Sequence, residues 1–329
     1  MKKRPVAIQA SCTCSSARLN RDEGLNAAMA PLVTVVILSY ARPDPLRQAI
    51  ESVINQAYPS LDIVVVDNKS QKSEAIARVV SRFPRVRFVQ NEENLGFAGG
   101  MNAGIATAAG EYIYLSEDDV ALRPGCLSSM MTYLERHLDA GLVAPVMYDQ
   151  SSGSVRSAGG RFALEPIFAL RIITERAPGQ GPLPFDVMYV PGASILARAQ
   201  LLKELRGFRD DFFLYQEDLE LCIRVLKSGH RVVTVPAAGV DHVDPPPGPA
   251  SDMVEYFRIR NLFATYVLHA PARVLPAFVL RYGVIDVTRT ILRNPRRGWL
   301  MVRAWLSVAM SAPRLLRDRD PRPLEASNL

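Results

Sequence analysis

The chain has 329 residues, which is enough for one large domain or two domains of ordinary size. Apolar residues make up 48% and charged residues 22%, which excludes a disordered or fibrous protein and predicts a globular core. The 39 basic and 33 acidic side chains give a net charge of +6. Because no basic patch interleaved with aromatic residues occurs in the first 250 residues, we expect no nucleic-acid partner.

The amino-terminal segment shows no pattern of secondary structure. It begins with basic residues but lacks the apolar core of about 7–15 residues that defines a signal peptide. We therefore expect residues 1–30 to be a disordered tail, and a protein start at Met29, directly before a strand, is an alternative. No apolar run in the chain reaches about 18 residues, so we expect no spanning helix. The four scattered cysteines lack metal-site spacing and indicate reduced thiols, hence a cytoplasmic protein.

The sequence from residue 32 to residue 119 alternates between short apolar runs and amphipathic segments. Runs rich in β-branched residues predict buried parallel strands, and apolar residues three or four positions apart predict helices. The predicted strands cover 32–38, 61–67, 86–94 and 111–119, and the predicted helices cover 44–56, 73–83 and 99–110. Strands that alternate with helices indicate an α/β fold with a mainly parallel sheet.

The second half of the chain is less regular. We predict strands over 186–190 and 194–197, a helix over 216–228 that Gly229 ends, and a strand over 231–235. A proline-rich linker at 244–250 precedes two or three helices, which we expect to be broken at Pro271, Pro276, Pro295 and Pro313. The predicted domains are therefore a catalytic-type α/β domain over 31–250 and a helical, arginine-rich extension over 251–329.

Polar residues follow each predicted strand of the first half. These strand ends carry Ser39–Tyr40, Asp67–Asn68, Asn91–Asn94 and Ser116–Asp119. In a parallel sheet, ligands bind beyond the carboxyl ends of the strands, and these ends share one rim. The sequence therefore predicts a binding site at that rim.

The segment "GFAGGMNAG" (96–104) is a glycine-rich turn that opens a helix. Such a turn can bind phosphate through free N–H groups. However, it follows the third strand and not the first, so a dinucleotide-binding interpretation is weak. Close packing of the helix on the sheet is a sufficient explanation for these glycines.

Two acidic clusters are candidates for chemistry. Glu117, Asp118 and Asp119 follow an apolar strand, and we favour a divalent metal with substrate phosphates there over a merely solvated loop. Glu217 and Asp218 begin a predicted helix, where acidic residues that suit the helix dipole are an equally good explanation. His242, directly after a strand, is either a ligand or an ordinary surface histidine.

Six segments in this order resemble family 2 glycosyltransferases with a GT-A fold, specifically the bacterial branch of rhamnosyltransferases and galactofuranosyltransferases. They are "VVILSYARP", "IVVVDNKS", "NLGFAGGMNAGI", "GEYIYLSEDDVALRPGCL", "YVPGASILARAQLL" and "GFRDDFFLYQEDLELCIRVLKSGHRVVTVPAAGVDH". The resemblance extends from Val33 to about Val243. The family's metal motif is Asp-x-Asp, and here Ser116 occupies its first position while Asp118 occupies its second.

The resemblance implies roles for individual residues. Asp118, Asp119 and His242 would hold Mg²⁺ or Mn²⁺, Asp218 would be the general base, and Glu217 would assist it. The nucleotide-sugar site would comprise Ser39, Tyr40, Arg42, Asp67, Asn94, Gly96, Asn102 and Glu117, with Asp67 on the nucleotide base.

The function that the resemblance implies is inverting, metal-dependent transfer of a sugar from a UDP- or dTDP-sugar. The acceptor would be a hydroxyl of a cell-surface glycan or of a lipid-linked substrate. One alternative is a nucleotidyltransferase of related fold, although no glycine- and arginine-rich pyrophosphate loop follows the first strand. A second alternative is a non-catalytic module that binds sugar nucleotides or glycans.

The carboxy-terminal extension concentrates the positive charge of the chain. From Val254 to Leu329 it has 13 arginines, no lysine and 5 acidic residues, a net charge of +8. Mixed aromatic, aliphatic and arginine residues are typical of helices that lie on an anionic membrane surface. We favour a peripheral location on the inner face of the cell membrane, with a helical cap bearing solvated arginines as the alternative.

Overall fold

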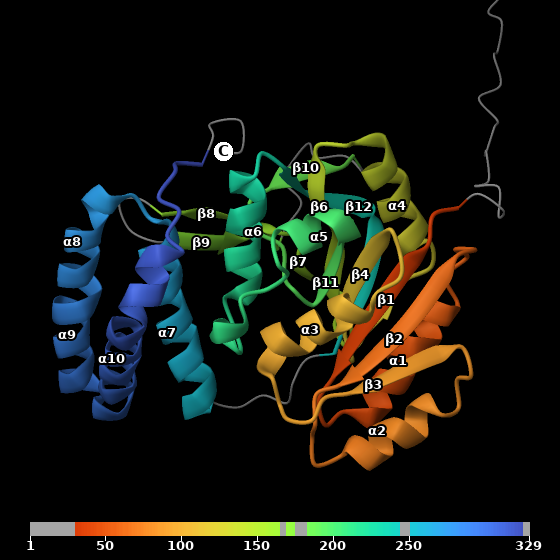
Figure 1. Cartoon of the computed structure of the whole chain (residues 1–329), viewed down its shortest axis with the longest axis horizontal. Coiled ribbons are helices and arrows are strands. Elements are labelled where there is room, and N and C mark those ends of the chain that lie inside the picture. Colours follow the sequence, from red (N-terminus) through yellow and green to blue (C-terminus); the bar gives the residue numbers. More distant parts are fainter. Residues whose placement is uncertain (1–29, 165–168, 175–182, 244–250, 325–329) are drawn as a thin grey trace, which may run out of the picture. The chain divides into compact units, whose positions relative to one another are not determined.

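The computed structural model describes residues 30–164, 169–174, 183–243 and 251–324. The expected tail at 1–29 and the linker at 244–250 lie outside these residues. Within them, ten strands form one sheet in the order β10–β12–β6–β11–β4–β1–β2–β3, with β5 beside β12 and β7 beside β6 (Figure 1). The strands are β1 (Val33–Ser39), β2 (Leu61–Asp67), β3 (Val86–Gln90), β4 (Tyr112–Glu117), β5 (Val120–Leu122), β6 (Ala140–Asp149), β7 (Val155–Ser157), β10 (Phe185–Val187), β11 (Ser194–Arg198) and β12 (Arg231–His242). A separate pair comprises β8 (Gly160–Ala163) and β9 (Ala169–Ile172).

The first half of the sheet agrees with the predicted strands. β1 pairs in parallel with β2 and β4, and β2 pairs in parallel with β3, so their carboxyl ends meet at one edge. All seven residues of β1 are buried, which explains its β-branched apolar composition. The connecting helices are α1 (Pro43–Ile54), α2 (Ser73–Val80) and α3 (Gly96–Thr107).

The glycines of α3 allow the helix to lie close against the sheet. A Cβ at Gly104 would lie 2.2 Å from Val36 Cγ1, a separation that real Cβ contacts essentially never show. A Cβ at Gly100 would meet Leu38 Cδ1 at 2.6 Å. This close approach supports the packing explanation of the "GFAGGMNAG" segment.

The second half contains elements that the sequence pattern did not reveal. The helix α4 (Cys126–Arg136) and the long, almost wholly buried strand β6 were not predicted. β12 continues to His242, well past the expected end at Val235, because a bulge between Val235 and Gly239 accommodates Pro236. β11 runs antiparallel between β4 and β6, so the sheet is mixed. The fold is nevertheless α/β with mostly parallel strands in its first half.

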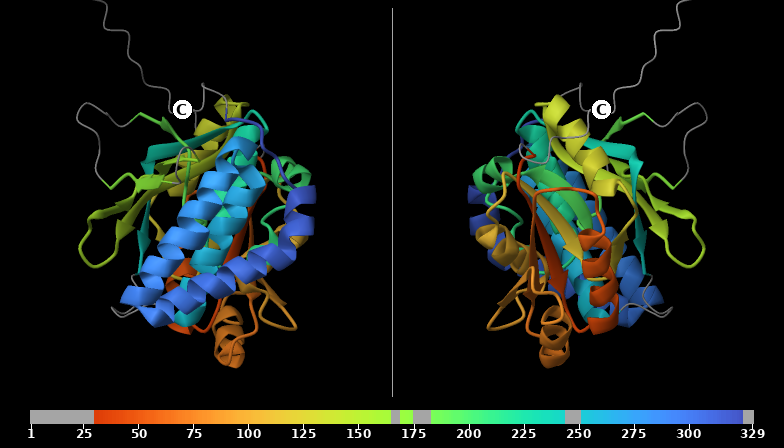
Figure 2. Two further views of the ribbon diagram at one scale, coloured as in Figure 1. Left: turned by 90° about the vertical axis from the view of Figure 1, so that its left-hand side faces the viewer. Right: turned by 90° about the vertical axis from the view of Figure 1, so that its right-hand side faces the viewer.

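The helices after β11 begin with α5 (Ala199–Glu204) and α6 (Glu217–Lys227), followed by α7 (Asp252–His269), α8 (Leu275–Phe278), α9 (Asp286–Arg293) and α10 (Pro295–Arg317). α10 packs against both α7 and α9, and the three lie side by side (Figures 1 and 2). Pro271 follows the end of α7 and Pro295 begins α10, as expected. Pro313 lies inside α10, so the predicted break there is wrong. Among the described residues, no helix is long and apolar enough to cross a membrane.

The carboxy-terminal helices have their own apolar core. It includes Phe263, Tyr266, Phe278 and Ala304, and it also takes in Phe212 from the loop before α6. The Tyr266 and Phe278 rings stack with their centroids 4.0 Å apart. The loop that leads into α6 is thus packed on the carboxy-terminal helices.

Candidate active site

The ends of β1 and β4 place Ser39, Tyr40 and Asp118 in direct contact. Asp118 is 1% exposed, and its Oδ2 accepts hydrogen bonds from Ser39 Oγ at 2.8 Å and from the Tyr40 backbone N–H at 3.0 Å. β1 and β4 are paired in register up to Leu38 and Glu117. The register therefore brings together residues that are 79 positions apart in the sequence.

The Arg42 guanidinium compensates the triple carboxylate. It forms ion pairs with Glu117 (Nη2 to Oε2, 3.7 Å) and Asp118 (Nε to Oδ1, 3.1 Å), and a close contact with Asp119. Ala41, directly before it, has a φ of 64°, which turns the chain from β1 toward the carboxylates. A cation on the protein itself thus lies among three acidic side chains that would otherwise repel one another.

Two of these carboxylates retain oxygens without a hydrogen-bond partner. Asp118 Oδ1 and Asp119 Oδ1 are buried and accept no hydrogen bond, and their neighbours are the ion-paired Arg42 Nε and, at 3.7 Å, His242 Nε2. Burial raises the pKa of Asp118 to about 6, and burial together with the nearby Asp119 charge raises the pKa of Glu117 to about 8. Carboxylate oxygens are the ligands that Mg²⁺ and Mn²⁺ prefer, so Asp118 and Asp119 fit a divalent cation.

His242 lies beside this pair at the end of β12. Its Nε2 is 3.7 Å from Asp119 Oδ1, and its Nδ1 is 3.0 Å from Arg156 Nη1. Burial lowers its pKa, which favours the neutral imidazole that a metal ligand requires. Nevertheless, nowhere in the described part of the chain do three His, Cys, Asp or Glu side chains gather into a complete metal cluster. Two carboxylates with substrate phosphates and water are the usual alternative for Mg²⁺.

The second acidic cluster begins α6, and three donors from two segments hold Asp218. Its Oδ2 accepts from Tyr189 Oη at 2.8 Å and from the Gly192 N–H at 3.1 Å, and its Oδ1 accepts from the Leu219 N–H at 2.7 Å. Burial raises the pKa of Asp218, and these donors oppose that increase. Burial and the Asp218 charge raise the pKa of Glu217 well above its usual range.

The segment before β11 joins the two acidic clusters. Gly192 donates to Asp218, while the next residue, Ala193, accepts from the Glu117 N–H at 3.3 Å. The negative charge of Asp218 contributes to the raised pKa of Glu117. The cluster after β4 and the cluster at the start of α6 are therefore neighbours in the fold.

An asparagine network lies at the ends of β2 and β3. Asn68 Nδ2 donates to Asn94 Oδ1 (3.1 Å) and to the Gly96 carbonyl (2.7 Å), and Asn91 donates to Asn68 (2.9 Å). Asp67 is fully buried and accepts from Gln90, but its Oδ1 has no hydrogen-bond partner. That oxygen can accept a hydrogen bond from a ligand at this edge.

The structure does not bring Asn102 to either acidic cluster, and its Nδ2 contacts the Asp210 carboxylate instead. Its Nδ2 donates to the Phe208 carbonyl and its Oδ1 accepts from the Phe208 N–H, both at 2.8 Å. The sequence analysis also missed Tyr189, although it lies in the quoted segment "YVPGASILARAQLL". No spacing rule connects Tyr189 to Asp218, which lies 29 positions away, so only the fold reveals the pair.

Comparison with known proteins identifies the family. The model of "Glycosyl transferase family 2" matches residues 34–206, more than half of the chain. This chain belongs to glycosyl transferase family 2. The match confirms the resemblance drawn from the sequence and shows that the chain is a glycosyltransferase, which leaves the nucleotidyltransferase and non-catalytic alternatives without support.

Individual relatives are more distant. The chain is 27% identical over 236 residues to the N-acetylglucosaminyl-diphospho-decaprenol L-rhamnosyltransferase of Mycobacterium tuberculosis, covering 65% of this chain and 76% of the relative. It is 28% identical over 132 residues to an uncharacterized glycosyltransferase of Haemophilus influenzae, covering 39% of this chain but only 41% of that relative.

A solved structure supports the fold. GalNAc-T7 with UDP, GalNAc and Mn²⁺ superposes with a TM-score of 0.59 at 15% identity, covering 72% of this chain and 48% of that chain. At this identity the likeness shows the GT-A fold alone.

Proposed function

We propose that this family 2 glycosyltransferase is an inverting, metal-dependent enzyme that transfers a sugar from a UDP- or dTDP-sugar to a hydroxyl group. The observation that carries the proposal is the pair of neighbouring acidic clusters, one after β4 and one at the start of α6, which Gly192 and Ala193 join. One cluster suits a diphosphate with its cation, and the other suits a base that activates the acceptor. An inverting displacement needs no further catalytic group.

Asp218 is the proposed general base. Tyr189 and the Gly192 N–H donate to the same oxygen, which fixes the carboxylate in one orientation. A carboxyl whose pKa is raised by burial is better matched to accepting a proton near neutral pH. Asp218 would take the proton of the acceptor hydroxyl, and Glu217, whose raised pKa favours the neutral carboxyl, lies directly beside it.

Asp118 and Asp119 are the proposed residues that hold Mg²⁺ or Mn²⁺, with His242 next to them. The cation, when bound, would neutralise negative charge on the diphosphate leaving group. Arg42 contacts the same carboxylates and can also approach the diphosphate. Ser39 and the Tyr40 N–H orient Asp118 for this purpose.

The nucleoside side of the donor is assigned to the ends of β2 and β3. The free, buried Oδ1 of Asp67 is suited to an N–H of a pyrimidine base. Asn94 and Gly96, both held by Asn68, are assigned to the same part of the donor site, and Glu117 is assigned to the donor as well. Asn102 is also proposed for the donor site, and in the structure its amide is engaged by Phe208.

The proposed acceptor is a cell-surface glycan or a lipid-linked substrate, and the proposed location is the cytoplasmic face of the membrane. The relative from M. tuberculosis is named for a diphospho-decaprenol substrate. α9 and α10 expose Leu292 (80%), Trp299 (65%) and Met310 (78%). Between η3 (Val279–Ile285) and α10 lies an apolar groove of about 310 Å³, lined by Val284, Val302, Trp305 and Leu306 among others. These surfaces suit contact with lipid.

The test separates donor binding from chemistry. Isothermal titration with UDP, dTDP and their sugars, with and without Mn²⁺, identifies the donor in the wild-type protein. Asp118→Asn should abolish the Mn²⁺-dependent part of that binding, because it removes a metal ligand. Asp218→Asn should bind the donor normally and lower turnover by about 10² or more.

Asp139→Asn is the matched control, because Asp139 lies in an exposed ion pair with Arg231. It should change neither donor binding nor turnover. Full transfer in excess EDTA would contradict metal dependence. Near-normal turnover of Asp218→Asn would remove that residue from the mechanism.

A further inference from the structure

The loop that leads into α6 has an unusual backbone. Phe213, Tyr215 and Gln216 all have positive φ values (60°, 67° and 69°), although none of them is a glycine. Gln216 is the residue directly before α6, so this conformation sets the direction in which Glu217 and Asp218 leave the loop. A positive φ is unfavourable for a residue other than glycine and persists only where the surroundings enforce it.

Asn261 of α7 supplies the groups that enforce it. Its side chain is fully buried, and its Nδ2 lies within hydrogen-bonding distance of the carbonyls of Phe212 (2.7 Å), Leu214 (2.9 Å) and Tyr215 (2.7 Å). One side-chain amide thus serves three carbonyls of a single short loop. The Phe212 carbonyl also accepts from the Leu214 N–H at 2.6 Å, so the Asn261 amide matters most to the carbonyls of Leu214 and Tyr215.

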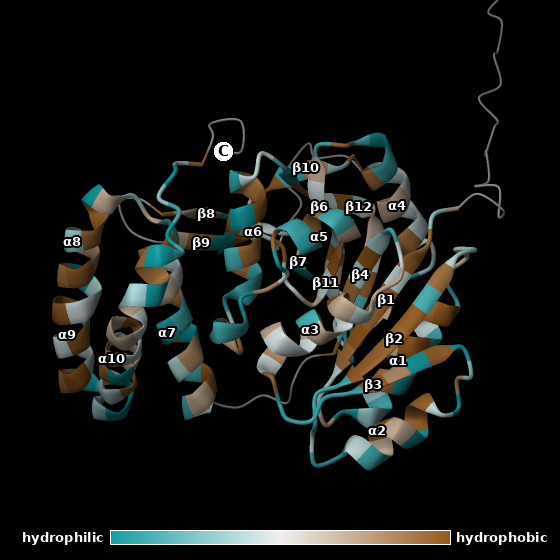
Figure 3. Ribbon diagram, viewed as in Figure 1, coloured by the Kyte–Doolittle hydropathy of each residue, from teal (hydrophilic) through white to brown (hydrophobic). Residues whose placement is uncertain are grey.

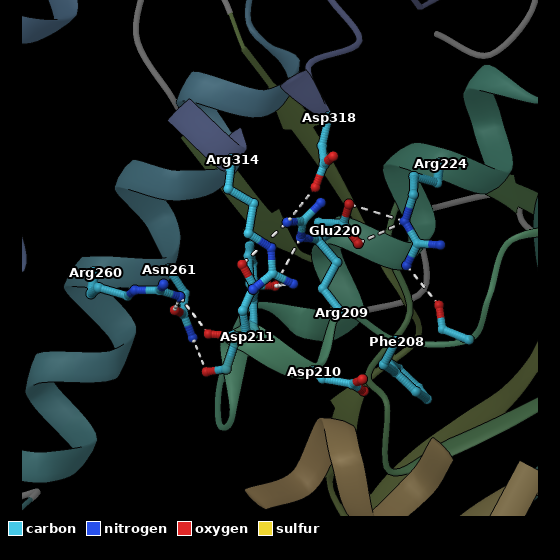
Figure 4. Close-up of polar contacts among 12 residues, drawn as sticks. Phe208, Arg209, Asp210, Asp211, Glu220, Arg224, Arg260, Asn261, Arg314 and Asp318 are labelled. Carbon is cyan, nitrogen blue, oxygen red and sulfur yellow. Dashed lines mark hydrogen bonds and ion pairs between the residues drawn. The ribbon is translucent and has the colours of Figure 1, made fainter. Parts of the chain in front are cut away.

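Arg260 fixes the orientation of that amide. Its Nη1 donates to Asn261 Oδ1 at 2.8 Å and to the Asp211 carbonyl at 2.7 Å (Figure 4). Because the oxygen of Asn261 accepts from Arg260, its nitrogen must face the loop. Arg209, two residues earlier in the same segment, and Arg314 of α10 both pair with the Asp211 carboxylate and hold the start of the loop (Figure 4).

The loop also contacts the amino-terminal turn of α3, which belongs to the proposed donor site. The Phe213 carbonyl accepts from the Ala98 N–H at 3.3 Å, and a Cβ at Gly96 would lie 2.2 Å from that carbonyl oxygen. The loop is therefore wedged between α7 and the amino-terminal turn of α3. A shift of the loop would move the base at the start of α6 relative to the donor at α3.

We propose that Asn261 and Arg260 are positioning residues for glycosyl transfer: α7 fixes the 212–216 loop and thereby places Asp218 against the acceptor. The proposal rests on the proposed role of Asp218. It makes the first carboxy-terminal helix a working part of the active site, in addition to any role in packing or membrane contact. A displacement of about 1 Å at a reacting group can lower the rate about 10²-fold.

The principal variant is Asn261→Asp in the full-length protein. It keeps the size of the side chain but replaces the donor with an oxygen that repels the three carbonyls. Turnover of the donor that wild type uses should fall about 10- to 100-fold, while the affinity for free UDP or dTDP changes less than about 3-fold. Hydrogen exchange at amides 213–219 should accelerate about 10-fold or more, with the strands of the sheet unchanged.

Thr265→Val is the matched control one turn further along α7. Thr265 is also fully buried, and its Oγ1 has no hydrogen-bond partner, so this variant tests substitution within the helix without touching the loop. It should leave turnover and exchange at 213–219 unchanged. Should Asn261→Asp not fold, Arg260→Lys is the second variant, because it keeps the charge and loses the planar donor. Its turnover should fall about 3- to 10-fold, while the affinity for free UDP or dTDP stays nearly unchanged.

Two results would overturn the proposal. One is unchanged exchange at 213–219 in a folded Asn261 or Arg260 variant, which would show that the loop holds itself. The other is a loosened loop with undiminished turnover. If instead Asp218→Asn retained full turnover, the proposed function would fail, while the exchange measurement would still decide whether α7 holds the loop.

Discussion

At the scale of single residues, the charges in the site are balanced within the chain itself. Arg42 contacts Glu117, Asp118 and Asp119, which follow a strand 70 and more positions later in the sequence. An arginine and a divalent cation both stabilise the same carboxylates, so the two are expected to act partly in place of each other. This sharing gives a test that needs no knowledge of the donor.

Arg42→Ala should lower the melting temperature in EDTA, because it leaves three carboxylates close together without a cation. Mn²⁺ should then raise the melting temperature more in this variant than in wild type, since binding to the folded state stabilises it. Differential scanning calorimetry measures both values. Arg47→Ala, which removes only an exposed ion pair with Glu51, is the control. Equal Mn²⁺ shifts in wild type and in Arg42→Ala would refute the shared role.

Tyr189 provides a prediction of pH dependence. Its hydroxyl donates to Asp218, which stabilises the charged carboxylate and opposes the increase in pKa that burial causes. Tyr189→Phe removes this donor, so the pKa of Asp218 should rise further and the base should become protonated at higher pH. The acidic limb of the kcat–pH profile should therefore move upward by about one unit.

Tyr58→Phe is the matched control for this measurement, because Tyr58 is also buried and donates to a carbonyl at Pro31, away from the acidic clusters. Its acidic limb should coincide with that of wild type. If Tyr189→Phe lowered kcat at every pH but left the acidic limb at the same pH as in wild type, Tyr189 would have no role in setting the pKa of Asp218.

At the scale of elements, the sequence predicts a contact best where a single rule of fold geometry determines it. The polar ends of β1, β2 and β4 were predicted to meet because parallel strands present their carboxyl ends at one edge, and Ser39 does contact Asp118. Tyr189 and Asn261 could not be predicted, because each acts across a tertiary contact whose register no periodicity encodes. The strength of a proline as a helix breaker was overestimated at Pro313, where burial of Leu315 beyond it holds α10 together.

Pro313 lies on the exposed side of α10 and cannot donate a backbone hydrogen bond to the preceding turn. Pro313→Ala should therefore stabilise the protein, by about 1–3 kcal/mol in urea unfolding at neutral pH. Ser311→Ala, two residues earlier in the same helix, should change stability by less than about 0.5 kcal/mol. A destabilised Pro313→Ala would mean that the proline fixes a bend on which the packing of α10 depends.

At the scale of the whole molecule, apolar and basic side chains occur together on the carboxy-terminal helices. Hydrophobic residues recur along α8 and α9 between hydrophilic ones (Figure 3). Within the described ranges, Arg281, Arg296 and Arg297 pair with carboxylates, whereas Arg289, Arg293 and Arg317 have no carboxylate partner. Unpaired arginines beside exposed apolar side chains favour an anionic lipid surface over water.

We therefore predict that the full-length protein sediments with phosphatidylglycerol vesicles and much less with phosphatidylcholine vesicles. Raising the salt from about 0.1 M to about 1 M shortens the Debye length from about 10 Å to about 3 Å, so binding should weaken but leave an apolar remainder.

The double variant Arg289→Glu and Arg293→Glu should remove the salt-dependent part, because each arginine near such a surface contributes about 1 kcal/mol. Trp299→Ser with Leu306→Ser should remove the remainder. Leu138→Ser, an equally exposed apolar residue (79%) near α4, should have no effect. If the wild-type protein ignored anionic vesicles at low salt, the helices would be a packed cap and their arginines would serve only to interact with water.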